Sequence, residues 1–511
     1  MSPLETFVTE FLKASAVSYF FRQYAVILCL FLLGALLSDL LLAPGQSRPR
    51  RCVIAFPAGV SAFVLTAYIM LVTGIVYNTL TVCIALIAEA VAVTVLNRRS
   101  IAAFCGSGKI KRMIPAICAV LVTAAVATSG IAPVSITNDT MYYFKRYPDC
   151  IVYYGGLRDQ FDFFLTDTGL GIVSLDTLPA LFGFGDTFGI REFFHINFIA
   201  FFGISVHERA KRYLGGKSAL PAAVVVTAFL VFATPFVILG HWALANMYFM
   251  EMFFIAAYIA TDYEDNGANL TPLLLLALSL FRIEGTVFAV WLILCIALFT
   301  NLAKKLVLFV LIPMGILFGS YCIKVFTQFY VLDNIYLFMS PQKAVILVGF
   351  IVAAGIYLWF IYPRLPEKIA GHLPAIYIVA LAGGNLLLCI ANPEHYIGNL
   401  RAFYANLFRQ SGWGMLPYFV VAMTLFLAAE YIIARKGGKP LPEVTNRFNI
   451  TLTIGFILIV LAASFGRGDV LAEEVGDSGN RVLLQVVPLI VMTYGGLFLR
   501  LACRWRKEEA G

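Results

Sequence analysis

Long apolar runs recur along most of the chain, and short polar stretches separate them. A helix of about 20 apolar residues crosses roughly 30 Å of hydrocarbon, and most of these runs approach or exceed that length. Strand-like segments of alternating polarity, which would indicate a membrane barrel, do not occur. The runs therefore predict about fifteen helices of an all-α transmembrane bundle. They cover residues 24–43, 53–76, 78–96, 113–132, 190–206, 218–240, 243–262, 270–282, 285–302, 306–326, 344–362, 373–391, 414–434, 448–465 and 483–501.

Two neighbouring predicted helices, 270–282 and 285–302, are short, and they flank a polar turn that contains Arg282 and Glu284. One kinked helix with a re-entrant piece would also fit this pattern, and it would change the number of spans. The distribution of charge favours two separate spans. We therefore predict a polytopic helical bundle with about 13–15 spans.

Lysine and arginine residues mark one side of this predicted bundle. When the spans alternate in direction, 24 of the 37 Lys and Arg residues fall on one side. By the positive-inside rule that side is cytoplasmic, which predicts a multi-pass protein of the cell membrane, inner or plasma. With 61% apolar and 13% charged residues, the composition excludes a water-soluble domain of 511 residues. The basic segments are 48–51, 98–112, 209–217, 304–305, 364–368, 435–447 and 500–507.

The longest polar stretch, residues 133–192, falls on the opposite, extracytoplasmic side and carries eight acids against four bases. We predict that residues 133–190 form a large first outer loop with short helices, within a catalytic module that covers residues 113–502. Residues 1–112 would supply an N-terminal interfacial helix and three accessory spans. Residues 503–511 would form a cytoplasmic tail.

Several common functional motifs are missing from the sequence. It has no phosphate-binding loop of the Walker A type, no dinucleotide-binding glycine pattern ahead of a helix and no HExxH zinc motif, which excludes nucleotide-driven pumps and zinc proteases. It also has no CxxC pair and no disulfide framework. Acids inside the predicted helices are few, and we expect each to serve in a helix–helix hydrogen bond or at the interface. They are Asp39, Glu89, Glu251 and Glu430.

Polar side chains gather at three positions on the predicted outer face. An arginine there would suit a lipid-linked phosphate, because a guanidinium grips phosphate oxygens through two bonds and keeps its charge. The three groups are Asn138-Asp139-Thr140 with Tyr142, Tyr143, Lys145 and Arg146; Arg282 with Glu284; and the segment from Asp477 to Arg481.

The order of these groups resembles the GT-C superfamily of integral membrane glycosyltransferases, over roughly residues 113–500. The matching pieces are Asp139-x-x-x-Tyr143 at the start of the first large outer loop, Arg282-Ile283-Glu284-Gly285 in a helix hairpin, and Asn480-Arg481 before a late helix. The chain departs from the family in two respects. No large soluble domain follows the last predicted span and the outer loops after residue 327 are short, which leaves acceptor recognition to the first loop and to the loops 327–343 and 392–413. Three spans also precede the helix that leads to Asp139, whereas the family commonly has one. The role of the accessory spans therefore stays open.

The resemblance implies transfer of a sugar from a polyprenyl-phosphate donor to an acceptor glycan, lipid or protein on the extracytoplasmic face. It assigns Asp139 as the general base. Chemistry supports the same role, because a hydroxyl that attacks an anomeric carbon must lose its proton to a nearby group. Asp139 could also cap a helix that begins at Met141, and the two roles are compatible.

The other candidate residues receive roles on the same basis. Binding of the donor phosphate is expected of Arg282, Arg481, Lys145 and Arg146. Binding of sugar or acceptor is expected of Tyr142, Tyr143, Glu284, His395 and Arg401. For His395, a hydrogen-bonded interfacial histidine is the simpler interpretation.

Two other functions would also need a polytopic protein with basic outer residues. A flippase or exporter of a lipid-linked saccharide would be expected to show related halves and a charged central path, and no internal repeat is evident. A polysaccharide polymerase or ligase would more typically depend on a large late outer loop, whereas here the early loop is the large one. Asp159, Asp162 and Asp167 could hold a divalent metal, but solvated loop acids are the simpler interpretation, so no metal and no cofactor are predicted.

Overall fold

The computed structural model describes most of the chain and shows an all-helical protein. Within the described residues every regular element is a helix, and no strand occurs. This confirms the predicted all-α class. The described residues are 14–42, 48–98, 114–129, 145–157, 169–184, 189–240, 245–262, 269–283, 285–327, 340–409, 413–436, 444–466 and 478–509.

Each of the predicted apolar segments coincides with one helix or with two or three consecutive helices. In order, the main helices are α2 (Ala14–Leu41), α3 (Arg48–Thr73), α4 (Thr79–Leu96), α6 (Ile114–Thr128), α12 (Gly189–Leu214), α13 (Gly216–Val231), α14 (Thr234–Gly240), α15 (Ala245–Asp262), α16 (Thr271–Phe281), α17 (Gly285–Phe299), α18 (Ala303–Leu306) with η3 (Val307–Leu311) and α19 (Ile312–Val325), α20 (Pro341–Ile356) with η5 (Tyr357–Ile361) and η6 (Tyr362–Arg364), α22 (Leu373–Ala391), α24 (Leu416–Lys436), α25 (Val444–Phe465) and α27 (Val487–Glu509).

Many of these helices are suited to a membrane. The described part of the chain contains nine helices that are long and apolar enough to span a bilayer, together with six shorter apolar helices. The protein is therefore a multi-pass helical membrane protein, as the composition predicts.

Shorter helices lie between the apolar ones. In the segment predicted as the first large loop they are α8 (Tyr147–Tyr154), α10 (Leu170–Leu175) and α11 (Leu178–Phe182), and elsewhere they are α21 (Glu367–Ala370), α23 (Pro393–Tyr404), η7 (Ala405–Arg409), α26 (Ser478–Leu483) and η9 (Leu484–Val486). Residues 392–413, which connect two predicted spans, contain the helix α23. Asn392 caps that helix by accepting a hydrogen bond from the backbone N–H of His395, and Pro393 occupies its first position, where no N–H is needed.

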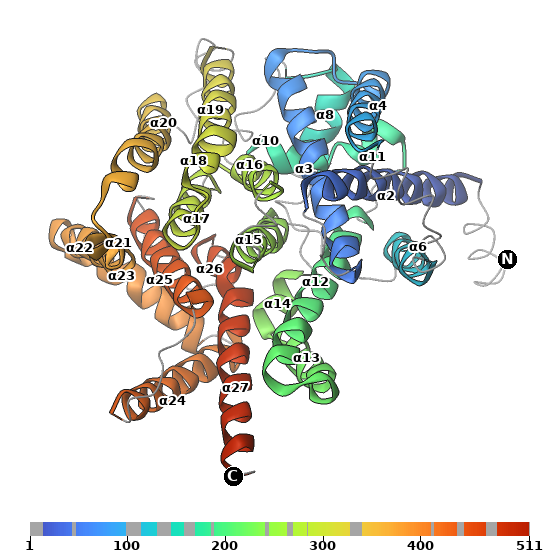
Figure 1. The fold of residues 1–511 in the computed structure, drawn as a ribbon. Helices are drawn as coiled ribbons and strands as arrows, with labels where there is room; N and C mark the ends of the chain where they lie inside the picture. Colours follow the sequence, from blue (N-terminus) through green and yellow to red (C-terminus); the bar gives the residue numbers. More distant parts are fainter. Residues whose placement is uncertain are drawn as a thin grey trace.

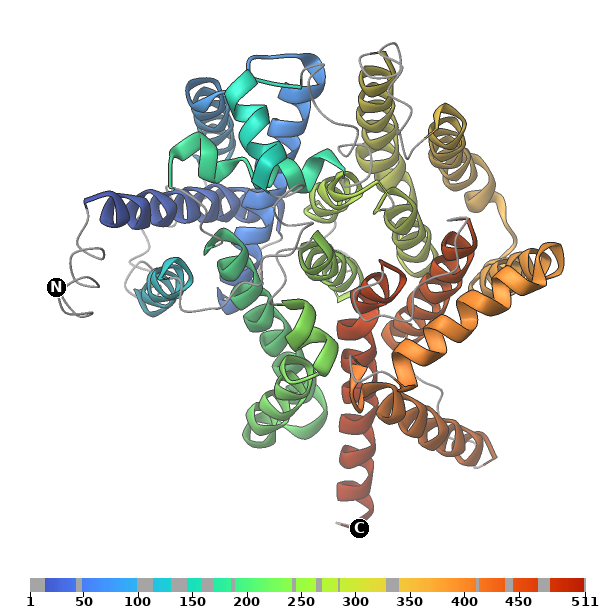
Figure 2. The ribbon, with the colours of Figure 1, turned by 180° about the vertical axis from the view of Figure 1, so that it is seen from behind.

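Helix α15 lies in the middle of the molecule, with the N-terminal helices α2, α4 and α6 on one side and the C-terminal helices α20 to α25 on the other (Figures 1 and 2). Its residues from Asn246 to Ala260 are all buried. A helix that is apolar around its whole circumference is expected in such a position. The central place of α15 matters for function, because its first two turns carry the polar residues Asn246, Tyr248 and Glu251.

Contacts between distant segments agree with the two sides that the charge distribution predicts. Segments assigned to the same side meet one another in the structure, although they are far apart in the sequence. Such pairs on the predicted outer side are Tyr77 with Thr177, Arg282 with Asn246 and His395 with Phe465; on the other side they are Asp39 with Arg51, Arg50 with Glu208 and Arg500 with Tyr213.

Candidate functional site

Arg282 occupies the break between two strongly apolar helices. Helix α16 ends at Phe281, the backbone of Arg282 is extended (φ −140°, ψ 157°), and α17 starts at Gly285 and packs against α16. The residues on either side of the turn therefore form two separate helices and not one kinked helix. The Nη1 atom of Arg282 donates a hydrogen bond to Oδ1 of Asn246, which is 3% exposed. This bond fixes the orientation of the guanidinium against the start of α15.

Two glycines allow α10 to pack directly onto this turn. Gly169, which has φ +79°, would place an added Cβ 2.6 Å from the Cα of Arg282, and a Cβ on Gly171 would overlap the carbonyl oxygen of Leu280. A side chain at Gly169 would be disfavoured by its backbone conformation as well as by this contact. The start of α10 is thus held against the end of α16, beside Arg282.

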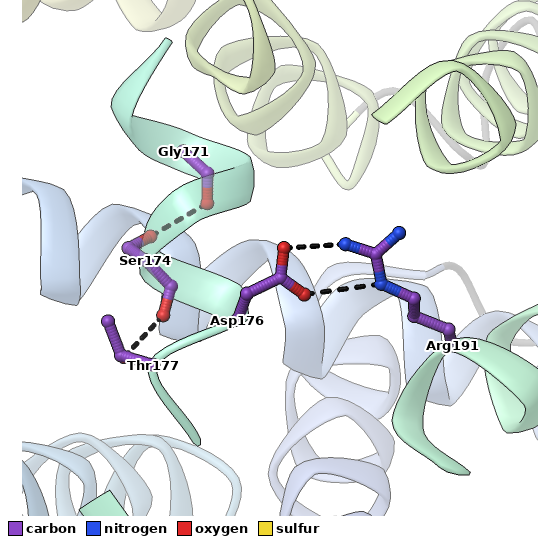
Figure 3. Close-up of polar contacts among 5 residues, drawn as sticks. All are labelled: Gly171, Ser174, Asp176, Thr177 and Arg191. Atoms are coloured by element: carbon purple, nitrogen blue, oxygen red, sulfur yellow. Dashed lines mark hydrogen bonds and ion pairs between the residues drawn. The ribbon is translucent and has the colours of Figure 1, made fainter. Parts of the chain in front are cut away.

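The other end of α10 is joined to α12 by an ion pair. Asp176 directly follows α10, and Arg191 lies in the first turn of α12. Nη2 of Arg191 donates to Oδ2 of Asp176 at 2.6 Å, and Nε donates to Oδ1 at 3.3 Å (Figure 3). Within α10 the Ser174 hydroxyl donates to the carbonyl of Gly171 at 2.7 Å, and the Thr177 hydroxyl donates to the carbonyl of Ser174 at 2.6 Å (Figure 3). The two-bond geometry is the strong form of an arginine–carboxylate contact, and it sets the position of α10 on α12.

The Asp176–Arg191 pair is nearly sealed from solvent, because the two side chains are 10% and 11% exposed. Burial raises the pKa of the Asp176 carboxyl from 3.8 to about 6, although the charge and hydrogen bonds of Arg191 act in the opposite direction. Desolvation of a buried carboxylate can outweigh the attraction of its partner. The pair therefore holds α10 and α12 in position, and the charge of its carboxyl group changes at mildly acidic pH.

One turn further along α12, His195 contacts Glu251 of α15. Nδ1 of His195 lies 2.6 Å from Oε1 of Glu251, which is 1% exposed, and the ring of Phe236 in α14 lies 5.0 Å from the imidazole ring. Glu251 thus serves in a helix–helix hydrogen bond, as expected. The same holds for Asp39, which pairs with Arg51, and for Glu89, which bonds to Thr66. The fourth acid, Glu430, has its side chain outside the described part.

Tyr248 completes this group, which we call the α12–α15 polar cluster: Asp176, Arg191, His195, Tyr248 and Glu251. The guanidinium of Arg191 lies 5.1 Å from the centroid of the Tyr248 ring, within cation–π distance. Tyr248 is 3% exposed, and its hydroxyl has no hydrogen-bond partner among the residues that the structure describes. The cluster therefore contains a buried hydroxyl beside a guanidinium and two carboxylates.

Together these contacts fix three segments relative to one another. Asn246 and the cluster residues Tyr248 and Glu251 lie within six residues of each other on α15, so Arg282 and the start of α12 are both held by the same stretch of helix. Helix α10 bridges them through its two ends. These neighbours therefore hold the guanidinium of Arg282 in one orientation.

Several residues predicted for the site lie outside the described part of the structure. These are the general base Asp139, the aromatic residues Tyr142 and Tyr143, the turn residue Glu284, and the loop acids Asp159, Asp162 and Asp167. Their roles stay predictions.

The remaining predicted residues are described, and the structure gives each a definite environment. Lys145 forms an (i, i+4) ion pair with Asp149 at 2.8 Å, with both side chains substantially exposed, and Arg146 is exposed immediately before α8. Arg481 lies in α26 and is partly buried, and η9, which follows it, packs against α15. Arg282 and Arg481 thus belong to two segments that both adjoin α15.

His395 and Arg401 lie on α23. Nε2 of His395 is 3.1 Å from the carbonyl oxygen of Phe465 and 3.4 Å from Nδ2 of Asn399, and its ring packs edge-on against Phe465. This is the environment of a hydrogen-bonded interfacial histidine. Arg401 is exposed on the same helix. Neither residue is joined to the α12–α15 polar cluster by a contact in the described structure.

The described residues contain no group of three or more His, Cys, Asp or Glu side chains that could hold a metal ion. Comparisons of the chain with protein-family models, with curated proteins and with solved structures found no match.

The polar cluster was not among the predicted site residues. In the sequence, Asp176 and Arg191 are two of the twelve charges of the polar stretch 133–192, and Glu251 is one of four acids inside predicted helices. One signal was available in the sequence: Arg191, Glu192 and His195 stand at the start of an apolar segment, where ionisable residues are costly and need partners. The identity of those partners depends on the packing of α12 against α10 and α15, which no sequence pattern specifies.

Proposed function

We propose that this protein is a membrane glycosyltransferase that moves a sugar from a polyprenyl-phosphate donor to an acceptor glycan, lipid or protein on the extracytoplasmic face. The observation that carries the proposal is Arg282, a cation at the break between two apolar helices, oriented by Asn246 and braced by α10. The sequence order of the loop aspartate, the Arg-x-Glu-Gly turn and the late Asn-Arg pair supports the same function.

In this proposal Arg282 binds the phosphate of the donor. A guanidinium forms two parallel hydrogen bonds with phosphate oxygens and stays charged at every physiological pH. The polyprenyl chain is apolar, so the phosphate of such a donor must sit where lipid meets polar groups, and the end of the α16–α17 hairpin offers that setting. Arg481 supplies a second cation, and Lys145 and Arg146 stabilise negative charge from the segment before α8.

Asp139 acts as the general base in this scheme. The acceptor hydroxyl loses its proton to the Asp139 carboxylate as its oxygen attacks the anomeric carbon, and the bond from that carbon to the phosphate oxygen breaks. The polyprenyl phosphate leaves with the bonding electron pair, and Arg282 stabilises the negative charge that develops there. Tyr142, Tyr143, Glu284, His395 and Arg401 are proposed to contact the sugar or acceptor.

The His195–Glu251 pair, in which Glu251 is buried and His195 partly exposed, favours a second candidate, a proton-coupled flippase or exporter of a lipid-linked saccharide. Ionisable pairs inside membrane helices often mark proton relays. The pair in this protein is bonded at 2.6 Å and covered by Phe236, which also suits a structural link between α12 and α15.

The proposal is tested with the purified protein in proteoliposomes and a panel of radiolabelled polyprenyl-phosphate sugars. We expect transfer of label to an acceptor with at least one donor. We also expect Arg282→Met to weaken donor binding by about tenfold or more, because charge-assisted hydrogen bonds contribute roughly 1.5–3 kcal/mol. Arg364→Met is the matched control, since Arg364 is an exposed arginine of η6 that donates to the carbonyl of Phe360 in the adjoining η5. Movement of intact donor across the bilayer without transfer would favour the exporter.

A further inference from the structure

A second buried arginine lies at the opposite end of α12 from Arg191. Arg209 is 4% exposed, and in the part of the chain that the structure describes its Nη1 atom has no hydrogen-bond partner. None of the described carboxylates forms an ion pair with it. A guanidinium does not lose its proton in proteins, so this charge persists inside the helix packing.

At the same end of α12, the charge of another buried arginine, Arg50 of α3, is compensated by a carboxylate. Arg50 is 3% exposed, and its Nη1 lies 2.5 Å from Oε2 of Glu208. Its guanidinium also lies over the ring of Tyr258, 5.1 Å from the centroid. Glu208 precedes Arg209 on α12, but consecutive helix residues point in different directions, so the acid serves Arg50.

Arg209 lies in the seam between α12 and α27. A Cβ added to Gly496 of α27 would be 3.5 Å from Nη1 of Arg209 and 3.8 Å from its Cζ, so the guanidinium lies along the bare backbone of that glycine. One turn further on both helices, the guanidinium of Arg500 lies 5.7 Å from the ring centroid of Tyr213. Residues four apart share a helix face, so Arg209 and Arg500 both border this seam.

The seam also has a route to the surface. Lys211 and Arg212, which follow Arg209 on α12, are exposed. The seam therefore runs from a buried guanidinium to an exposed, strongly basic surface. Basic pockets between membrane helices, on the side where Lys and Arg gather, are suited to the phosphate groups of anionic lipids.

We propose that the α12–α27 seam is a phosphate-binding site in which Arg209 is the buried ligand and Arg500 the second cation. The ligand is a phosphate group, carried by a lipid headgroup or free in solution. The planar fork of Arg209 donates to two phosphate oxygens, which compensates a charge that the described protein residues leave uncompensated. This site is separate from the proposed donor site at Arg282 and does not depend on glycosyl transfer.

Native mass spectrometry of the whole detergent-purified protein tests this site. The delipidated protein is titrated with dioleoyl phosphatidylglycerol, with dioleoylglycerol as the lipid without phosphate, and with inorganic phosphate. We expect phosphatidylglycerol to bind at least about tenfold more tightly to the wild type than to Arg209→Met, and dioleoylglycerol to show no such difference. Competition by inorganic phosphate at millimolar concentration, dependent on Arg209, would identify a soluble phosphate as the ligand.

Variants separate this site from general charge effects. Arg209→Lys keeps the charge without the planar fork, so we expect intermediate affinity, and this variant carries the test if Arg209→Met does not fold. Arg364→Met, remote and exposed, should bind phosphatidylglycerol as the wild type does. The proposal would be overturned if the wild type and both Arg209 variants bound phosphatidylglycerol with the same affinity, and if they also bound inorganic phosphate with the same affinity.

Discussion

The two ends of α12 differ in how their buried charges are compensated. At the first end Arg191 is paired with Asp176, and His195 is paired with Glu251. At the other end Arg209 is more deeply buried, but the described residues offer its Nη1 no partner. Helix α12 thus carries charged residues of two kinds. Paired charges fix the geometry of neighbouring helices, whereas Arg209, whose Nη1 has no partner among the described residues, is the basis of the proposed phosphate site.

Arg282 has a neutral side chain as its hydrogen-bond acceptor. Its Nη1 atom donates to the amide oxygen of Asn246, which orients the guanidinium and carries no net charge. This orientation at the break between two apolar helices is the basis for proposing Arg282 as a ligand of the donor phosphate. The paired charges of the α12–α15 polar cluster are the basis for its positioning role.

The largest expected effect comes from breaking the pair at the first end of α12. Arg191→Met leaves the Asp176 carboxylate buried without its partner, and we expect a loss of about 3–5 kcal/mol in the free energy of unfolding. Replacing both residues, as Arg191→Met with Asp176→Leu, should recover most of that loss, because the uncompensated charge is then gone. This double-mutant cycle is measured by unfolding each detergent-purified protein and monitoring the loss of helix by circular dichroism. Additive losses would contradict the positioning role.

The pH dependence of stability sharpens the same comparison. The pKa of Asp176 is raised from 3.8 to about 6 by burial, so the folded protein holds this proton more tightly than the unfolded chain. Between about pH 4 and 6 the folded state binds the proton that the unfolded state has lost. Its stability therefore falls as pH rises through this window and levels off above it, by about 3 kcal/mol in total at 1.36 kcal/mol per pKa unit.

The control for this pH effect is Asp176→Asn, which cannot ionise. The free energy of unfolding of this variant should not show the decrease between pH 4 and 6 that the Asp176 carboxyl causes in the wild type. Identical pH profiles for the wild type and Asp176→Asn in unfolding experiments would mean that Asp176 does not carry this proton.

A smaller effect is expected at the second pair. Glu251→Gln keeps the shape of the side chain but removes the charge from the hydrogen bond to His195, so we expect a loss of about 2 kcal/mol. The same variant separates the two candidate functions. In a glycosyltransferase the pair is structural and the protein should show no donor-dependent proton uptake in proteoliposomes, whereas an exporter driven through His195 and Glu251 would show uptake that the variant abolishes.

The sequence predicted the helices well and the polar contacts poorly, for physical reasons. Apolar runs such as those of α16 and α17 identify helices directly, because length and composition decide whether a segment can cross a bilayer. Helix α23 was missed because its polar residues at Asn392 and Glu394 resemble a loop, while its capping and its buried face become evident only in the structure. The break at Arg282 was predicted because charged residues interrupt an apolar pattern.

The partners of the site residues could not be predicted in this way. Asp176 follows the short helix α10 and pairs with Arg191 at the start of the long helix α12, and His195 meets Glu251 from a different helix. Such pairs depend on the relative rotation and depth of α10, α12 and α15, which the sequence of any one helix does not specify. The close packing of Gly169 and Gly171 on the α16 turn depends on tertiary structure in the same way.

The most direct measurement of the central claim compares Asp139→Asn with the wild type, using one defined polyprenyl-phosphate sugar and one defined acceptor. Asparagine keeps the size of the side chain and its capping capacity but cannot accept the proton. If Asp139 is the general base, transfer should fall by roughly 10²-fold or more, while donor binding, measured in parallel, and folding stay unchanged. Near-normal transfer by Asp139→Asn would contradict the account and would redirect the search for the base to Asp159, Asp162 and Asp167.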